Sequence, residues 1–286
     1  MAEDILKQLI IATLLTALIL TPSISDAGQF GPPEPVANEK KLSLGVGYFH
    51  FSEKLNAENP GELFSARQKI KQNQVYLQAG YGFIKNWELY LRLTRPDLKV
   101  DNAFDVTGLG VGGGQRTSDD FKDGFTPSGT LGVKGLLYDG PYLGIGPFFQ
   151  ASLFPNYKDK FRFNAGCSFF IPGCAAAGVA PAVDELKVKR PWDINLGIGL
   201  QTKVYGITLY GGPFAYWTGY KARFYIRTEA FGSASRFDET SYREKNNFGG
   251  FVGLRTPLPW VEGVQAEVEG QFKNKGSVGV SLHYPF

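Results

Sequence analysis

From Lys41 onward, hydrophobic and polar residues alternate along most of this chain. The alternation begins over 41–52, where Leu42, Leu44 and Val46 share one face and Ser43 and Gly45 lie on the other. A period of two is typical of β-strands whose two faces meet different surroundings. The pattern recurs in segments of about ten residues, the length that a tilted strand needs to cross the hydrocarbon layer of a membrane.

The spacing of these segments predicts about ten strands, with eight or twelve as alternatives. Four short turns fall on one rim of the predicted sheet, near 84–86, 139–141, 203–206 and 257–262. The longer connections, predicted as irregular loops, lie at 97–123, 155–187 and 226–243. The connection at 274–276 is short although it falls on the long-loop rim, which leaves the strand count open. An even count places both termini on the same side.

The polar face of these strands distinguishes a membrane barrel from a soluble sandwich. It is rich in Gly, Tyr, Gln and Ser and poor in Lys and Glu, unlike a water-exposed exterior. Aromatic residues collect at the ends of the apolar faces, as in an interfacial girdle: Tyr81, Phe83, Trp87, Trp192, Trp260, Tyr284 and Phe286. In hydrocarbon every backbone polar group must be paired, so a spanning sheet has to close. We therefore predict an all-β, closed, up-and-down antiparallel transmembrane β-barrel over 41–286, with a soluble sandwich or lipocalin-like barrel as the alternative.

The N-terminal region differs from the rest of the chain. Residues 9–20 form an apolar run, and small residues follow at 25–28. The run is too short for a spanning helix and predicts a signal peptide over 1–27, cleaved after Ala27, with a buried N-terminal helix as the alternative. Residues 28–40 contain three prolines and are predicted to form an extended periplasmic tether.

Composition changes this picture little. The 286 residues include 36 glycines, 14% aromatic residues, two cysteines and one methionine, which suits a sheet that bends closed and has aromatic rims. The net charge of +3 gives no argument for a nucleic-acid partner.

Cys167 and Cys174 lie within the second long connection. In an oxidising compartment we expect two such cysteines to form a disulfide, because a metal site needs more ligands than this loop offers. The surrounding residues 167–180 are apolar for a surface loop. They could fold into the barrel mouth, dip into the outer leaflet or contact a partner protein.

Eight charged or titratable residues fall on the predicted inward face: Glu88, Arg92, Lys134, Asp193, Arg255, Glu267, Glu269 and His283. In a narrow barrel such charges are expected to pair across the lumen and plug it. The alternative is a narrow polar conduit that they line.

Three stretches of this sequence resemble the broad superfamily of small Gram-negative outer-membrane β-barrels. They are 80–93, the Tyr138 to Pro141 turn and the terminal strand 278–286, and the likeness extends over 41–286. The resemblance implies an outer-membrane location with both termini periplasmic and contact with outer-membrane lipid and lipopolysaccharide. It also implies that Tyr284 and Phe286 form the C-terminal signal read by the barrel-assembly machinery.

Catalytic motifs are weak in this sequence. The glycine-rich run 108–114 precedes no helix pattern and is predicted to be a surface loop. Omptin-type proteases need a histidine and aspartates at the outer rim, where only His50 could meet Asp119, Asp120 or Asp238. A Ser–His lipid-modifying site is a further alternative. We predict no enzyme activity, no catalytic residue, no cofactor and no metal.

The functional hypothesis is therefore a barrel with a filled lumen that has a structural or interaction role at the cell surface. Its partner would bind through loops 97–123, 155–187 or 226–243. Two alternatives remain: a narrow passive pore for small solutes, and a barrel subunit or anchor of an envelope complex. Because a fold does not determine a function, the resemblance does not choose among them.

Overall fold

The computed structural model describes residues 28–58, 67–101, 121–123, 127–166, 179–228, 235–244, 247–273 and 276–286. The predicted signal peptide 1–27, Cys167 and Cys174 lie outside the described residues. The described part of the chain forms one sheet of fifteen strands, and every pair of strands in it is antiparallel.

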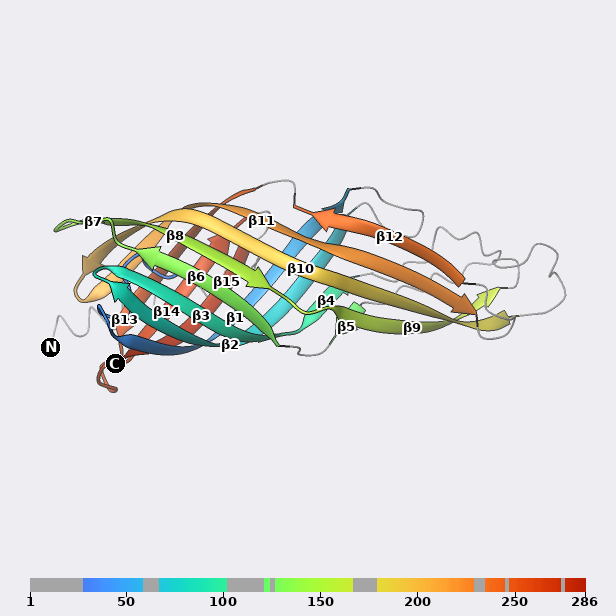
Figure 1. Cartoon of the computed structure of the whole chain (residues 1–286), viewed down its shortest axis with the longest axis horizontal. Coiled ribbons are helices and arrows are strands. Elements are labelled where there is room, and N and C mark those ends of the chain that lie inside the picture. The colour runs from blue at the N-terminus through green and yellow to red at the C-terminus, as the bar shows by residue number, and fades with distance from the viewer. Residues whose placement is uncertain are drawn as a thin grey trace.

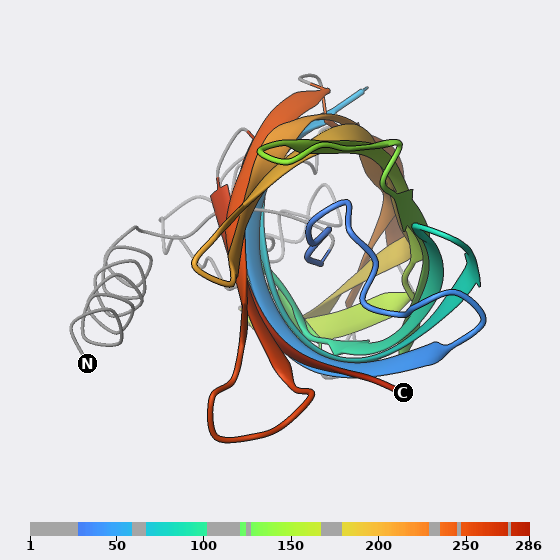
Figure 2. The same cartoon turned by 90° about the vertical axis from the view of Figure 1, so that its left-hand side faces the viewer.

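Ten of these strands close a barrel, which confirms the predicted fold class and strand number (Figures 1 and 2). In order around the wall they are β1 (Leu42–Ala57), β2 (Arg67–Ile84), β3 (Trp87–Pro96), β6 (Ser128–Gly135), β8 (Gly144–Leu153), β10 (Val179–Val204), β11 (Ile207–Thr228), β13 (Phe248–Pro257), β14 (Gln265–Phe272) and β15 (Gly276–Pro285). The last strand pairs with the first, with Leu44 opposite Tyr284 and Val46 opposite Leu282. The wall therefore has no free edge.

Short connections gather at one end of the barrel, which we call the turn end. They join β2 to β3, β6 to β8 through β7 (Tyr138–Asp139), β10 to β11, and β13 to β14. Tyr205 and Gly206 form a two-residue turn with φ of 51° and 81°, the left-handed geometry that suits the twist of a hairpin. The C-terminus lies at the same end (Figure 1).

At the opposite end the wall continues as a second, folded extension. It consists of β4 (Leu98–Asp101), β5 (Phe121–Asp123), β9 (Tyr157–Gly166) and β12 (Ser235–Arg243), together with the far parts of β1, β2, β10 and β11. We call this extension the collar. β9 pairs with the first half of β10, and β12 bridges β11 to β1.

The collar corrects the prediction of irregular loops over 97–123, 155–187 and 226–243. Parts of all three ranges are strands. The outward positions of these collar strands carry charged residues, whereas the outward positions of the barrel wall carry apolar residues. The strands were therefore missed by a prediction that relied on an apolar outer face. Their inward positions remain apolar and pack into one cluster, whose buried members include Phe51, Leu55, Val100, Tyr157, Leu186, Val188, Phe224 and Tyr242.

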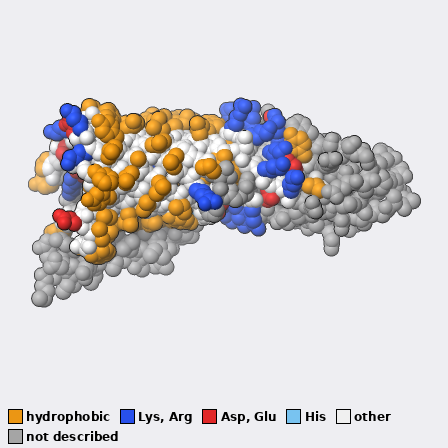
Figure 3. Space-filling model, turned by 60° about the horizontal axis from the view of Figure 1, so that its bottom comes forward, with side chains coloured by type: hydrophobic (Ala, Val, Ile, Leu, Met, Phe, Trp, Pro, Cys, Tyr) orange, Lys and Arg blue, Asp and Glu red, His pale blue; other side chains and the backbone are white. Residues whose placement is uncertain are grey.

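The outside of the barrel wall is an apolar belt. Leu77 is 62% exposed and Leu93 is 64% exposed, and similar side chains repeat around the wall. Figure 3 shows this belt with Lys and Arg gathered at both of its borders. No helix in the described ranges is long and apolar enough to cross a membrane.

Candidate functional site: a plugged barrel lumen

All eight titratable residues predicted for the inward face lie in the barrel interior. Each is 6% exposed or less: Glu88, Arg92, Lys134, Asp193, Arg255, Glu267, Glu269 and His283. They come from six strands, because the period of two points alternate side chains of every wall strand into the bore. Two of them pair directly with each other, since Arg255 Nη2 lies 2.8 Å from Glu267 Oε2.

The bore is filled by residues 28–37, which we call the plug segment (Figure 2). This differs from the expected periplasmic tether over 28–40. A proline-rich extended segment makes few hydrogen bonds within itself, so its N–H and C=O groups are open to other partners. The charged and amide side chains of the wall supply those partners inside the barrel.

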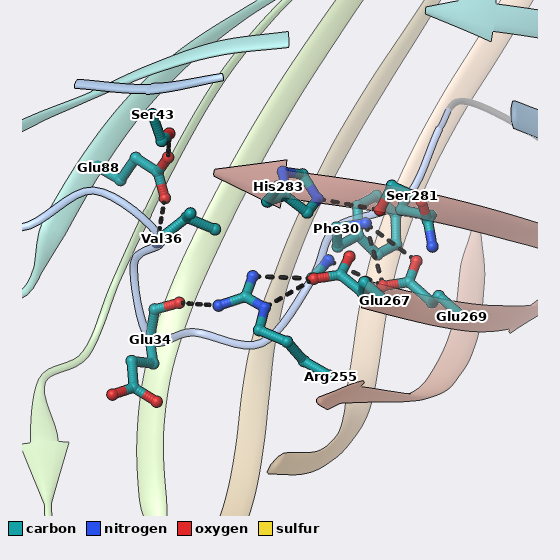
Figure 4. Close-up of polar contacts among 12 residues, drawn as sticks. Phe30, Glu34, Val36, Ser43, Glu88, Arg255, Glu267, Glu269, Ser281 and His283 are labelled. Carbon is teal, nitrogen blue, oxygen red and sulfur yellow. Dashed lines mark hydrogen bonds and ion pairs between the residues drawn. The ribbon is translucent and has the colours of Figure 1, made fainter. Parts of the chain in front are cut away.

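Glu269 on β14 is the first of two buried carboxylates that bind the plug backbone (Figure 4). The amide N–H of Phe30 donates to Glu269 Oε1 at 2.9 Å, and that of Gly31 donates to Oε2 at 2.8 Å. Gln271 Nε2 donates to the carbonyl of Gly28 at 3.0 Å and to Glu269 Oε1 at 2.8 Å. Both oxygens of the Glu269 carboxyl group therefore accept hydrogen bonds from the plug backbone.

Glu88 on β3 binds the other end of the plug (Figure 4). The Val36 amide donates to Glu88 Oε2 at 2.8 Å, and the Ser43 hydroxyl donates to Oε1 at 3.0 Å. Glu88 and Glu269 come from β3 and β14, which are not neighbours in the wall. The plug is therefore attached to well-separated parts of the wall.

Arginines bind the plug carbonyls. Arg92 Nη2 donates to the Gln29 carbonyl at 2.5 Å, and Arg255 Nη1 donates to the Glu34 carbonyl at 3.0 Å. The Gln29 side chain in turn accepts a hydrogen bond from the Tyr76 hydroxyl at 2.6 Å. Donors and acceptors on the wall thus match the polar groups of the plug backbone.

Phe30 is the apolar anchor of the plug. Its ring is 1% exposed and stacks on Phe148 at 4.3 Å between ring centroids. Phe214 and Phe251 meet it edge-on at 4.9 and 5.3 Å. These rings come from β8, β11 and β13, so the plug also contacts wall strands other than those that carry Glu88 and Glu269.

Two glycines allow the plug to pass close to the charged wall. Gly28 has φ of 58° and Gly31 has φ of 74°, a conformation that other residues rarely adopt. A Cβ on Gly31 would lie 2.8 Å from Lys134 Nζ and 3.2 Å from Arg255 Nη2. The positive φ therefore favours glycine at this position, and a larger residue would also have to displace the ends of the Lys134 and Arg255 side chains.

At the turn end the plug leaves part of the bore open. A cavity of about 350 Å³ lies between the plug and the wall, lined by residues that include Glu34, Lys203, Arg255 and Gln265. Lys203 Nζ forms an ion pair with Glu34 Oε1 at 2.6 Å across its rim.

Among the described residues, His283 forms a Ser–His pair of the kind that the hypothesis of a lipid-modifying enzyme requires. Its Nε2 lies 2.9 Å from Ser281 Oγ. The other ring nitrogen, Nδ1, has no hydrogen-bond partner and faces Gly45. Neither side chain is more than 4% exposed. The pair lacks the acidic group that orients the histidine in a catalytic triad.

His50 lies on the outside of the wall, near the collar. Its Nδ1 is 2.7 Å from Asn73 Oδ1, and Asn73 donates to Asp97 at 2.9 Å. Asp238 lies on β12, while Asp119 and Asp120 are outside the described residues. No cluster of three or more potential metal ligands occurs in the part of the chain that the structure describes.

Reasoning from the sequence missed the plug and its aromatic socket. Phe148 and Phe214 fall on the inward face of their strands. Two such large rings inside a narrow bore could have indicated that the bore contains an apolar partner. Gly28, Phe30 and Gly31 lie in a segment without periodicity, so no local pattern placed them.

Comparisons with known proteins find likeness in fold only. No family model matches the chain, and no curated protein matches it. Similar solved structures include the translocator domain of autotransporter NalP from Neisseria meningitidis, at 13% identity over 87% of this chain and 90% of that one, with a TM-score of 0.43. The outer membrane protease OmpT from Escherichia coli has 11% identity over 91% and 99% of the two chains, with a TM-score of 0.42. A Pseudomonas aeruginosa FadL homologue has 10% identity over 92% and 98%, with a TM-score of 0.34. These proteins are outer-membrane β-barrels. The activities that their names mention are properties of those proteins and are not assigned to this chain.

Proposed function

We propose that this protein is a closed, non-catalytic barrel of a Gram-negative outer membrane that acts at the cell surface through its collar. The apolar belt and the edgeless wall suit a hydrocarbon environment, because closure pairs every backbone group of the wall. In this orientation the turn end and the C-terminus are periplasmic and the collar faces outward, since short periplasmic turns and longer outer segments are typical of such barrels.

The plug is the observation that carries this proposal. It bonds to β2, β3, β10, β13 and β14 and packs on β8 and β11. A solute crossing the barrel would have to displace these contacts together. Beyond the plug, the collar is a folded structure with its own apolar interior, so its outward face is a defined surface that a partner can bind.

Conductance in a planar bilayer tests whether the lumen is closed. We expect the purified full-length protein, inserted in the bilayer, to show no steady channel. A stable conductance from the unaltered protein would overturn the proposal of a closed barrel.

A gated passage for small polar solutes is the second candidate. It is favoured because side chains of the wall hold the plug, which is not a strand of the wall; the bridge between Glu39 and Gly82 lies just after the plug. The cavity at the turn end also leaves room for movement. Deleting 28–37 should then open a steady channel lined by the eight titratable residues. A deletion variant that inserts and stays closed would exclude this candidate.

A further inference from the structure

The outward face of the collar carries two clusters in which three lysines surround one carboxylate. In the first, Lys69, Lys71 and Lys99 place Nζ at 3.4, 2.8 and 3.8 Å from the Asp101 carboxylate. In the second, Lys158, Lys160 and Lys187 lie at 3.2, 3.7 and 2.7 Å from the Glu185 carboxylate.

The two clusters share one construction. In each, two lysines lie directly opposite each other on paired strands, Lys71 with Lys99 and Lys158 with Lys187. The third lysine in each lies opposite the acid, Lys69 with Asp101 and Lys160 with Glu185. Like charges directly opposite in a sheet repel each other, and one carboxylate offsets only one of the three ammonium groups in each cluster.

The row of cations continues across the collar. Lys99 on β4 also faces Lys122 on β5, and Lys187 on β10 also faces Arg223 on β11, which forms an ion pair with Glu239. Between the two halves, the Lys122 amide donates to Asp159 on β9 at 2.7 Å. Paired positions on six collar strands, β2, β4, β5, β9, β10 and β11, therefore carry basic side chains.

The local potential of the first cluster is positive. Burial acts to raise the pKa of the Asp101 carboxyl, but hydrogen bonds and charges from Lys71 and Lys69 outweigh burial and lower that pKa. Asp101 lies on β4, in the collar and outside the apolar belt. Its carboxylate is held ionised by an excess of ammonium groups.

The row borders the apolar belt. On β2 the outward residues run from Lys71 through Asn73 to Val75 and Leu77, which are 55% and 62% exposed. Figure 3 shows Lys and Arg at this border of the belt. Headgroups of the outer leaflet lie at this level when the belt occupies the hydrocarbon layer.

We propose that the row binds the phosphate groups of a phosphorylated outer-leaflet glycolipid, with the two three-lysine clusters as its main sites. Converging ammonium groups suit phosphate, and the adjoining belt suits the acyl chains of the same molecule. This inference rests on the proposed membrane location. A lipid is favoured over a soluble anion because charge and apolar surface are continuous here.

Binding of lipid A to the folded, detergent-solubilised full-length protein tests the inference. Native mass spectrometry would compare lipid A carrying two phosphates with lipid A whose phosphates have been removed. The double variant Lys71→Gln/Lys187→Gln, one change in each cluster, should bind the phosphorylated lipid about fivefold more weakly at each of the two clusters. Lys41→Gln/Lys85→Gln, at the turn end, is the matched control and should bind like the unaltered protein.

Asp101→Asn separates lipid binding from a structural role of the lysines. Removing the carboxylate leaves the ammonium groups for phosphate, so binding should tighten about fivefold. A structural ion-pair cluster would instead lose stability with no gain in binding.

Equal binding of the two lipids, or no effect of the double variant, would overturn the inference. Insertion into phosphatidylcholine vesicles is measured in parallel. A protein that inserts into these vesicles but binds both forms of lipid A equally contradicts this inference alone. Failure to insert into any vesicle contradicts the proposed membrane location.

Discussion

At the scale of single residues, buried carboxylates replace the pairing partners that the plug backbone lacks. Glu269 is 0% exposed and accepts backbone N–H groups from two consecutive plug residues. The cost of burying this polar group is offset by these donors and by Gln271. Such a residue acts by holding the plug in place.

Glu269→Gln should loosen the plug. The glutamine amide has one acceptor oxygen where the Glu269 carboxyl group has two, so one plug N–H loses its acceptor, and a buried donor without a partner costs about 1–3 kcal/mol. We expect brief openings in planar-bilayer recordings of the variant. Glu262→Gln, at an exposed position in the β13–β14 turn, is the control and should show no channel openings. If the Glu269→Gln protein shows no more channel openings than the unaltered protein, then Phe30 and the arginines hold the plug without this carboxyl group.

At the scale of elements, β15 closes the wall and brings the C-terminus to the turn end. The Phe286 amide donates to the Leu42 carbonyl at 2.9 Å, and its ring meets Tyr284 edge-on at 5.1 Å. The ring is 56% exposed on the outside of the wall. The last residue therefore extends the seam between β15 and β1 while its ring remains accessible.

Deleting Phe286 should reduce assembly more than it reduces the stability of barrels already formed. The deletion removes one seam hydrogen bond, which contributes about 1 kcal/mol, whereas an accessible terminal aromatic is what the assembly machinery is proposed to read. The measurement is the amount of folded protein in the outer membrane. Trp260→Ala, an exposed aromatic in the β13–β14 turn, serves as control and should leave that amount near normal. Normal levels of the deletion protein would contradict the proposed signal.

At the scale of the whole molecule, two zones follow one another along the long axis, the barrel with its plug and the collar (Figure 1). The bore near the turn end is polar and holds the plug. The wall around it faces outward with apolar side chains, and the collar reverses this arrangement with an apolar interior and a charged exterior. This reversal is what we expect where the surroundings change from hydrocarbon to water.

Val188→Asp should unfold the collar and leave the barrel intact. Val188 is 1% exposed in the collar cluster, and a buried carboxylate without a partner costs several kcal/mol. The reconstituted variant should be cut by protease in β9 or β12 while the wall strands remain protected. If the surface role is correct, cells carrying it should also lose attachment to their target surface. Ser241→Asp, at a collar position that is not fully buried, is the control and should change neither readout. Unchanged attachment after collar unfolding would count against the surface role.

The sequence alone determined the wall. Alternation with a period of two is a local property, so it identified the strands that cross the belt, the closed fold and the inward positions of residues as far apart as Glu88 and His283. It also placed the short turns, because their residues carry their own backbone preferences.

The tertiary structure decided the plug, the collar and the lysine row. Phe30 and Glu269 are 239 positions apart in the sequence. Residues 28–37 show no periodic pattern that could predict where they lie in the fold. Collar strands carry charge outward, so they lack the apolar-out pattern. The opposition of Lys71 to Lys99 exists only through the register of β2 and β4. Contacts between distant segments depend on how the sheet closes, and that geometry is not a property of any one stretch of sequence.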